Sequence, residues 1–164
     1  MLKSLNAFVD IALMSEPKKI AIAAAEDMST LVAMKKIVEL NIATPVFFGN
    51  EKQIKEICSS LDFDISSFEI HDLNDKPKAS QAAVSCIREG KADVLARGAI
   101  ETPDYLRPVL NRDTGLKQSK LISQAAFVEI RAYLNRTLFQ TIRAYLNRTL
   151  FQTIRPQAKC NMAS

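Results

Sequence analysis

The sequence predicts an α/β fold of three layers, in which helices cover both faces of a parallel sheet, followed by a helical C-terminal tail. Short apolar runs alternate with segments of helical periodicity through residues 1–130. The connections between them are short, which is typical of strands joined by crossover helices. The four glycines all fall at expected turns, at Gly49, Gly90, Gly98 and Gly115.

The first half of the chain begins with an expected helix over residues 4–14, which Pro17 ends. Residues 19–24 are almost all apolar, as in a strand buried on both faces. Asp27 is a good N-cap for the next helix. The apolar residues of that helix have the spacing of one buried face: Leu31, Met34, Ile37 and Val38.

The pattern then repeats twice. Residues 46–48 are the second expected strand, and Gly49 turns the chain into a helix marked by Ile54, Ile57 and Leu61. Residues 68–70 are the third strand, and residues 79–89 the third helix. Gly90 closes that helix in the position that most favours glycine.

The last repeats are a strand at residues 93–96, a helix from Thr102, and a fifth strand at residues 121–129. Thr102 is a good N-cap, and Pro103 suits the first helical position. Pro108 is expected to limit the length of this helix or to bend it.

The segment after residues 93–96 has the features of an anion site. The strand ends on Arg97 and Gly98, and the helix from Thr102 carries Arg107 one turn later. Ligands of open α/β sheets bind beyond the carboxyl ends of the strands, near helix N-termini. The alternative is that Arg107 is a surface residue and Thr102 only a cap. We expect Glu101 and Asp104 to pair with the arginines rather than to act as acid or base.

Composition excludes several classes of protein. The apolar share of 48% is enough for a packed core, and no apolar run reaches the ~20 residues of a membrane span. The N-terminus has no secretory signal pattern, so a cytoplasmic location is expected. The three cysteines, Cys58, Cys86 and Cys160, have no disulfide or metal spacing. His71 alone is expected to be a polar residue at a strand end, and no metal site is expected.

Nucleotide-binding loops are also absent from the sequence. No glycine belongs to a G-x-G-x-x-G or a G-x-x-x-x-G-K-[ST] pattern. The body, residues 1–130, has 16 basic and 18 acidic residues, a net charge of −2, whereas residues 131–164 carry +6 and no acid. The overall charge of +4 therefore does not indicate a nucleic-acid partner for the body.

The tail differs from the body because it contains a repeat. The twelve residues RAYLNRTLFQTI occur at 131–142 and again at 143–154. Each copy has the pattern of a basic amphipathic helix. Twelve residues leave the second apolar face roughly 120° away from the first, so one straight helix would not align them. Three interpretations stay open: a local duplication with a shifted reading frame, a helix that packs on the body or on a second subunit, and a helix that binds a partner or a membrane surface.

The body resembles the phosphate acetyltransferase and phosphate butyryltransferase family. The likeness rests on segments that follow one another in order: KIAIAAA at 19–25, PVFFG at 45–49, ADVL at 92–95, GAIETPDYLRPVLN at 98–111, GL at 115–116 and LIS at 121–123. Together they cover some 110 residues, and the segment at 98–111 is the most specific of them.

The resemblance implies an enzyme that exchanges an acyl group between coenzyme A and inorganic phosphate, giving an acyl phosphate. It implies the first of two α/β domains like those of isocitrate and isopropylmalate dehydrogenases, small-molecule substrates, no bound cofactor, and a homo-oligomer, usually a dimer. Arg107 corresponds to the substrate-binding arginine of the family, and Thr102 lines the same pocket. Arg97 and Gly98 are the further expected substrate-binding residues.

Two departures from the family stand out. A small residue or a lysine is usual where Arg97 stands, and a histidine is common where Gln124 stands. The family chain also continues for well over a hundred residues past the point that matches Ile130, into a second domain that holds the serine, arginine and aspartate used in catalysis. No catalytic residue is therefore assigned in this chain.

The sequence leaves alternative functions. The preferred one is a phosphate acyltransferase of the acetyl or butyryl type, complete or truncated. The second is a non-catalytic binding or assembly module, in which the basic tail packs on a partner. A decarboxylating dehydrogenase of related fold is disfavoured, because the clustered aspartates of a divalent metal site are lacking.

Overall fold

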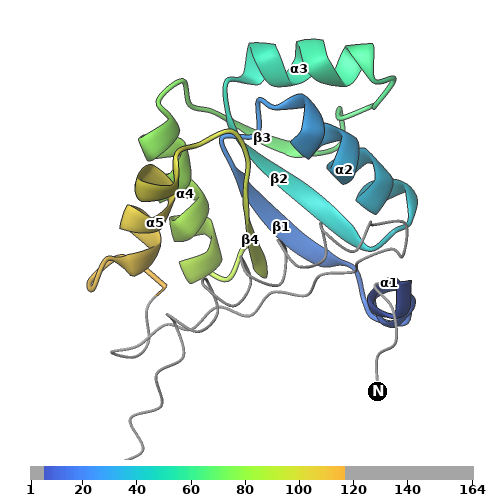
Figure 1. Cartoon of the computed structure of the whole chain (residues 1–164), viewed down its shortest axis with the longest axis horizontal. Coiled ribbons are helices and arrows are strands. Elements are labelled where there is room, and N and C mark those ends of the chain that lie inside the picture. Colours follow the sequence, from blue (N-terminus) through green and yellow to red (C-terminus); the bar gives the residue numbers. More distant parts are fainter. Residues whose placement is uncertain (1–5, 117–164) are drawn as a thin grey trace, which may run out of the picture. The chain divides into compact units, whose positions relative to one another are not determined.

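The computed structural model describes residues 6–116, with side chains from residue 9 onward (Figure 1). Helices and strands alternate through this part of the chain. Their order is α1 (Asn6–Leu13), β1 (Lys18–Ala23), α2 (Met28–Glu39), β2 (Ala43–Gly49), α3 (Glu51–Ser60), β3 (Glu69–Asp72), α4 (Lys76–Arg88), β4 (Val94–Arg97) and α5 (Thr102–Leu110).

The four strands form one parallel sheet in the order β3-β2-β1-β4. In the strand register, Ala21 of β1 lies opposite Val46 of β2 on one side and opposite Leu95 of β4 on the other. The chain moves outward from β1 through β2 to β3 and then returns to the other side of β1. The direction of winding therefore changes between β1 and β4, where the expected anion site would lie.

Helices cover both faces of this sheet, so the predicted three layers are confirmed. Figure 1 shows α2 and α3 on one side and α4 and α5 on the other. Successive residues of β1 point to opposite faces, which gives two cores. Ile22 packs with Leu31 and Phe47 beneath α2 and α3. Ala21 and Ala23 pack with Ala79 and Ala83 of α4.

The second core consists largely of small residues, and this has a geometric consequence. Alanines from β1 meet alanines from α4, all of them completely buried. Without large side chains between them, α4 lies close to the sheet. The N-terminus of α4 is thereby held beside the carboxyl ends of the strands.

Most of the predicted elements are confirmed, and two of their ends are corrected. Asp27 caps α2 as predicted, and Gly90 follows α4 with φ of 70°. However, α4 begins at Lys76 rather than at residue 79, because Asp75 caps it. The prediction that Thr102 caps α5 is wrong: Glu101 is the N-cap, and Thr102 is the first helical residue.

Two predictions lie outside the described residues. These are the fifth strand at residues 121–129 and the helical tail with its repeat at residues 131–164. The division of the chain into residues 1–130 and 131–164 therefore stays a prediction.

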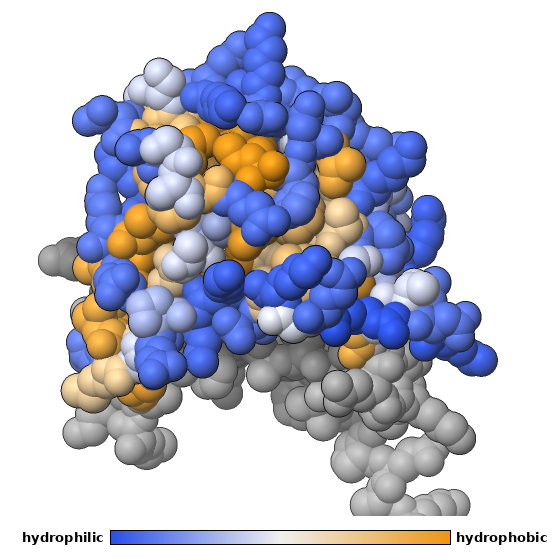
Figure 2. Space-filling view, turned by 180° about the vertical axis from the view of Figure 1, so that it is seen from behind, coloured by the Kyte–Doolittle hydropathy of each residue, from blue (hydrophilic) through white to orange (hydrophobic). Residues whose placement is uncertain are grey.

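Exposed apolar side chains are found at several places on the described surface. The largest exposed fractions are on and just after α1, where Ile11 is 53%, Leu13 50% and Met14 88% exposed. Val94, on the edge strand β4, is 45% exposed. Figure 2 shows that hydrophobic residues also gather on the rear face, with hydrophilic residues around them. No helix in residues 6–116 is long and apolar enough to cross a membrane.

Candidate functional site

The carboxyl ends of β1 and β4 are bound to each other by the loop that follows β4. The Gly98 N–H donates to the Ala23 carbonyl at 2.8 Å, and the Ala99 N–H donates to the Ala24 carbonyl at 2.8 Å. Ala24 has φ of 55°, a left-handed conformation that costs a non-glycine residue roughly 1 kcal/mol. The loop thus continues the pairing of the two strands past their ends.

Gly98 is required at this junction by its close approach to β1. A Cβ at this position would lie 2.1 Å from the Ala24 carbonyl oxygen and 2.9 Å from the Ala24 carbonyl carbon. Backbone atoms that are themselves hydrogen-bonded are not free to move away. Gly98 therefore shapes the loop, and its own N–H is already used by Ala23.

Arg97 holds the remainder of the loop with its guanidinium. Its Nε and Nη2 donate to the Ile100 carbonyl at 2.9 and 2.6 Å, and its Nη1 donates to the Thr102 hydroxyl at 2.9 Å. The structure thus brings Arg97 and Thr102 into direct contact. It also explains why Thr102 is not a cap, because its hydroxyl accepts from the arginine instead of from the helix backbone.

The N-terminus of α5 differs from those of α2, α3 and α4, which also begin at the carboxyl edge of the sheet. Asp27, Asn50 and Asp75 each accept a backbone N–H of the helix that they precede, at 2.9, 2.9 and 3.1 Å. Glu101, which precedes α5, makes no such side-chain bond. The first-turn N–H groups of α5 are therefore not neutralised by a side chain from their cap. The hydroxyl of Thr102, the first residue of that turn, accepts from the Arg97 guanidinium.

Arg107 lies apart from the cluster of Arg97 and Thr102. It follows Thr102 by five residues, about 7.5 Å along the helix and about 140° around it. Its side chain is 78% exposed, and its Nη1 lies 3.8 Å from Asp104 Oδ1. The predicted pairing with an arginine is confirmed for Asp104 at that distance, but it is wrong for Glu101, which forms no ion pair within the described residues.

The Arg107 side chain lines a groove of about 390 Å³ between α4 and α5. Lys78, on the facing helix, is a second cation of this groove. The other residues that line it are Asp75, Pro77, Gln81, Asp104, Pro108 and Asn111. The predicted site residues therefore form two groups: Arg97, Gly98 and Thr102 at the sheet, and Arg107 in the groove.

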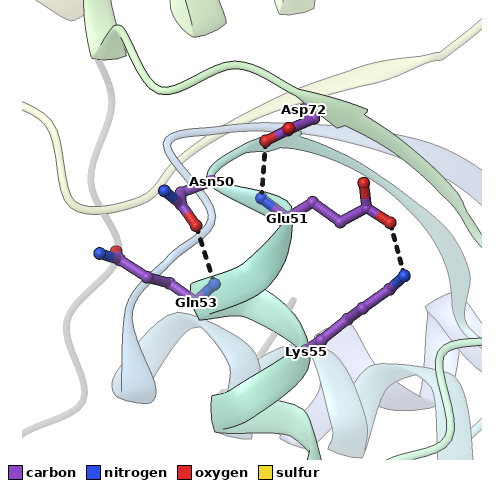
Figure 3. Close-up of polar contacts among 5 residues, drawn as sticks. All are labelled: Asn50, Glu51, Gln53, Lys55 and Asp72. Carbon is purple, nitrogen blue, oxygen red and sulfur yellow. Dashed lines mark hydrogen bonds and ion pairs between the residues drawn. The ribbon is translucent and has the colours of Figure 1, made fainter.

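At the opposite end of the same sheet edge, the side chains that bind the helix N-terminus are amides and carboxylates, and the N–H groups of that helix already have acceptors. Figure 3 shows the start of α3, where Asn50 Oδ1 accepts the Gln53 N–H and Asp72 Oδ1 accepts the Glu51 N–H at 3.1 Å. Lys55 forms an ion pair with Glu51. Carboxylate and amide oxygens occupy these helix amides, so this end of the edge is not suited to an anion.

Within residues 6–116, the two thiols are buried and the histidine is stacked on an aromatic ring. Cys58 and Cys86 are buried, and burial raises the pKa of both thiols. His71 is the next-to-last residue of β3, near the strand end as predicted, and its ring stacks on Phe48 with ring centroids 4.4 Å apart. Among the described residues, no three metal-ligating side chains lie close enough together to hold an ion.

Two lysines at the start of α4 are part of this region although the sequence did not indicate them. Lys76 Nζ donates to the Ala99 carbonyl at 2.6 Å, and Lys78 lines the groove of Arg107. The sequence signal was the Lys76-Pro77-Lys78 run after an aspartate. An aspartate cap followed by proline begins a helix, which would have placed both lysines in its first turn.

The chain is similar in sequence to one protein family and to several known proteins. The family described as "Phosphate acetyl/butaryl transferase" matches residues 4–84. A phosphate butyryltransferase of Clostridium beijerinckii is 39% identical over 116 residues, which are 71% of this chain and 38% of that protein. A phosphate acetyltransferase of Thermotoga maritima is 30% identical over 113 residues, 69% of this chain and 38% of that protein.

A solved structure shows the same fold. A phosphotransacetylase from Streptococcus pyogenes superimposes with a TM-score of 0.55 at 16% identity, covering 65% of this chain and 42% of that chain. The chain thus spans about two fifths of the length of the relatives that it matches. The N-terminal portion of this chain is thus similar in sequence to phosphate acetyltransferases and phosphate butyryltransferases, and it shares the fold of a phosphotransacetylase.

Proposed function

We propose that this chain is a phosphate acyltransferase of the acetyl or butyryl type, complete or truncated. The observation that carries the proposal is the 39% identity to a phosphate butyryltransferase over 71% of the chain. The substrates are a coenzyme A thioester and inorganic phosphate, and the products are an acyl phosphate and coenzyme A. We further propose a cytoplasmic homo-oligomer, a dimer as is usual in the family, without a bound cofactor.

The reaction requires cations and hydrogen-bond donors rather than a covalent nucleophile from the protein. An oxygen of phosphate bonds to the thioester carbonyl carbon, and the carbon–sulfur bond breaks. The sulfur leaves as a thiolate and takes up a proton. Two negatively charged groups must be held together while charge grows on the carbonyl oxygen, so fixed positive groups lower the barrier.

The cluster at the end of β4 supplies such groups. The Arg97 guanidinium and the first-turn N–H groups of α5 lie on the same loop, and Gly98 allows that loop to approach β1. We propose that a substrate oxyanion binds beside Thr102, whose hydroxyl Arg97 orients. Arg97 acts there mainly through position, since all three of its nitrogens already donate to the loop.

Arg107 is proposed as the second anchor, in the groove between α4 and α5. Its exposed guanidinium is suited to grip a phosphate group with two parallel hydrogen bonds, and Lys78 adds charge from the facing helix. Coenzyme A carries several phosphates and is long enough to occupy both regions. The proposal therefore assigns contact with the substrate to Arg107 and Thr102, and it assigns Arg97 and Gly98 to the binding site as residues that shape its loop. It assigns catalysis to no residue of this chain.

The experiment that tests this function is thiol release from acetyl-CoA and butyryl-CoA by the purified chain, with and without inorganic phosphate. Phosphate-dependent release would establish acyl transfer by this chain alone. Binding of coenzyme A without release would support a substrate-binding part that lacks the remaining three fifths of its relatives' length. A chain that neither binds nor releases would contradict the proposal.

A second candidate function rests on the charge of the tail. Residues 131–164 carry +6 and no acid, so the chain could be a non-catalytic module that binds a partner through them. Binding to anionic vesicles that weakens steeply with salt would favour this function. Removal of residues 131–164 without any effect on binding would exclude it.

A further inference from the structure

We infer that Lys76 is a positioning residue of the site, which holds the loop between β4 and α5 in its binding conformation through the Ala99 carbonyl. The inference rests on the proposed function and adds to it a residue that neither the sequence pattern nor the family resemblance assigns. The ammonium acts on the loop and not on the substrate.

The contact joins two elements that are far apart in sequence. Lys76 is the first residue of α4, and its Nζ lies 2.6 Å from the Ala99 carbonyl oxygen, 23 residues further along the chain. The buried alanines beneath α4 bring the start of this helix close to the sheet edge. A long flexible side chain then spans the remaining gap to the loop.

Ala99 is consequently bound on both of its backbone groups. Its N–H donates to the Ala24 carbonyl at 2.8 Å, and its carbonyl accepts from Lys76. Arg97 binds the next carbonyl, that of Ile100, and the Thr102 hydroxyl. Two cations therefore bind adjacent carbonyls of one short loop, Arg97 from the end of β4 and Lys76 from the start of α4.

Lys76 does not stabilise its own helix by its charge, which favours a role for this lysine in the loop that it contacts. A cation at the first helical residue is repelled by the positive end of the helix dipole. The charge-assisted bond to the Ala99 carbonyl offsets that repulsion. Lys76 is also exposed, so its removal leaves the packing of α4 on the sheet unchanged.

Loss of this contact should act on ligand binding through the geometry of the loop. α5 begins at Thr102, three residues after Ala99, so the positions of Thr102 and of the first-turn N–H groups depend on the loop that Ala99 belongs to. We expect Lys76→Met to weaken the binding of coenzyme A or inorganic phosphate about tenfold, the effect of one charge-assisted hydrogen bond. The melting temperature should stay close to that of the wild type.

The test uses the full chain and two readouts. Calorimetry measures the binding of coenzyme A and of inorganic phosphate to the wild type, Lys76→Met and Lys76→Arg. Hydrogen exchange of the free protein measures protection of the Gly98 and Ala99 N–H groups, which the loop conformation maintains. Lys52→Met is the matched control, since Lys52 is an exposed lysine in the first turn of α3 at the same sheet edge.

We expect faster exchange at these two amides and weaker binding in Lys76→Met, with both restored by Lys76→Arg, whose guanidinium also donates to a carbonyl. Lys52→Met should match the wild type. Unchanged exchange and binding in Lys76→Met, or failure of Lys76→Arg to restore them, would overturn the inference. A wild-type chain that binds neither ligand would overturn the proposed function, and the exchange rates would still decide whether Lys76 holds the loop.

Discussion

The two ends of the sheet's carboxyl edge are built from the same elements but with opposite charge. At the helices that follow β1, β2 and β3, two aspartates and one asparagine are the N-caps, and a third aspartate accepts the first N–H of α3. At β4, α5 has no such cap, and Arg97 and Lys76 bind the loop before it. We call a helix N-terminus closed when a side chain of its N-cap accepts a backbone N–H, and open when none does. One edge of the sheet thus contains closed N-termini that stabilise the fold and an open one, at α5, that is suited to an anion.

The largest expected effect on the α5 end of the sheet edge is at Gly98, where the loop after β4 meets β1. A Cβ there would lie 2.1 Å from the Ala24 carbonyl oxygen, so Gly98→Ala should lower the free energy of unfolding by about 3 kcal/mol, as overpacking against fixed atoms does. Urea unfolding measures this change. The same substitution should also abolish ligand binding, because the start of α5 would be displaced.

Gly90 is the matched control for this effect. A Cβ at Gly90 meets no atom within 4 Å, although its φ of 70° disfavours other residues. Gly90→Ala should therefore cost only about 1 kcal/mol, the strain of the left-handed conformation alone. Equal losses in the two variants would show that backbone conformation, not close approach to β1, makes Gly98 necessary.

The next prediction separates binding from stability at Arg107. Its guanidinium is 78% exposed, and its pairing with Asp104 over 3.8 Å is worth at most about 0.5 kcal/mol. Arg107→Ala should leave the unfolding curve nearly unchanged. If Arg107 grips a phosphate group, the same variant should bind coenzyme A about tenfold more weakly by calorimetry.

Arg112 provides the comparison for Arg107, because it is an exposed arginine just beyond the end of α5. Arg112→Ala should bind coenzyme A as the wild type does. Equal weakening in both variants would mean that net charge, and not the groove between α4 and α5, determines binding. The assignment of Arg107 as a substrate-binding residue would then be abandoned.

The sequence alone predicts the sheet because its signals are local. The runs around Ala21 and Phe47 are continuous and apolar, which marks strands buried on both faces. Asp27 and Gly90 have side-chain or backbone properties that define a helix end wherever they occur. The start of α4 at Lys76 was missed because its first turn has no apolar periodicity.

The site is less predictable because its contacts depend on topology. Nothing adjacent to Thr102 indicates that an arginine five residues earlier occupies its hydroxyl, and that contact decides which residue caps α5. The bond from Lys76 to Ala99 needs the parallel sheet and the approach of α4 before the two atoms can meet. Such contacts follow from the fold and have no periodic pattern in the sequence.

The capping difference predicts a smaller but measurable contrast in stability. The Asp27 carboxylate accepts from the Thr30 N–H and from two hydroxyls, so Asp27→Ala should lower the free energy of unfolding by about 1 kcal/mol. Glu101 makes no such bond, and Glu101→Ala should change it by less than about 0.5 kcal/mol. If Glu101→Ala lowered the free energy of unfolding as much as Asp27→Ala, the N-terminus of α5 would not be uncapped as the structure has it.

The smallest expected effect is the pH dependence of the closed cap. Hydrogen bonds from the Ser29 hydroxyl and from Thr30 lower the pKa of Asp27 in the folded chain. A lowered folded pKa means that this stabilisation is complete above the unfolded pKa, about 3.9, and is lost as the pH falls through the folded pKa.

Asp27→Asn keeps a capping oxygen but does not titrate. The wild type should therefore be the more stable of the two at about pH 6, and urea unfolding should show that advantage shrinking as the pH falls below about 4. A difference that stays constant over this range would mean that the carboxylate charge of Asp27 contributes nothing to the closed cap, and that its oxygen acts only as a neutral acceptor.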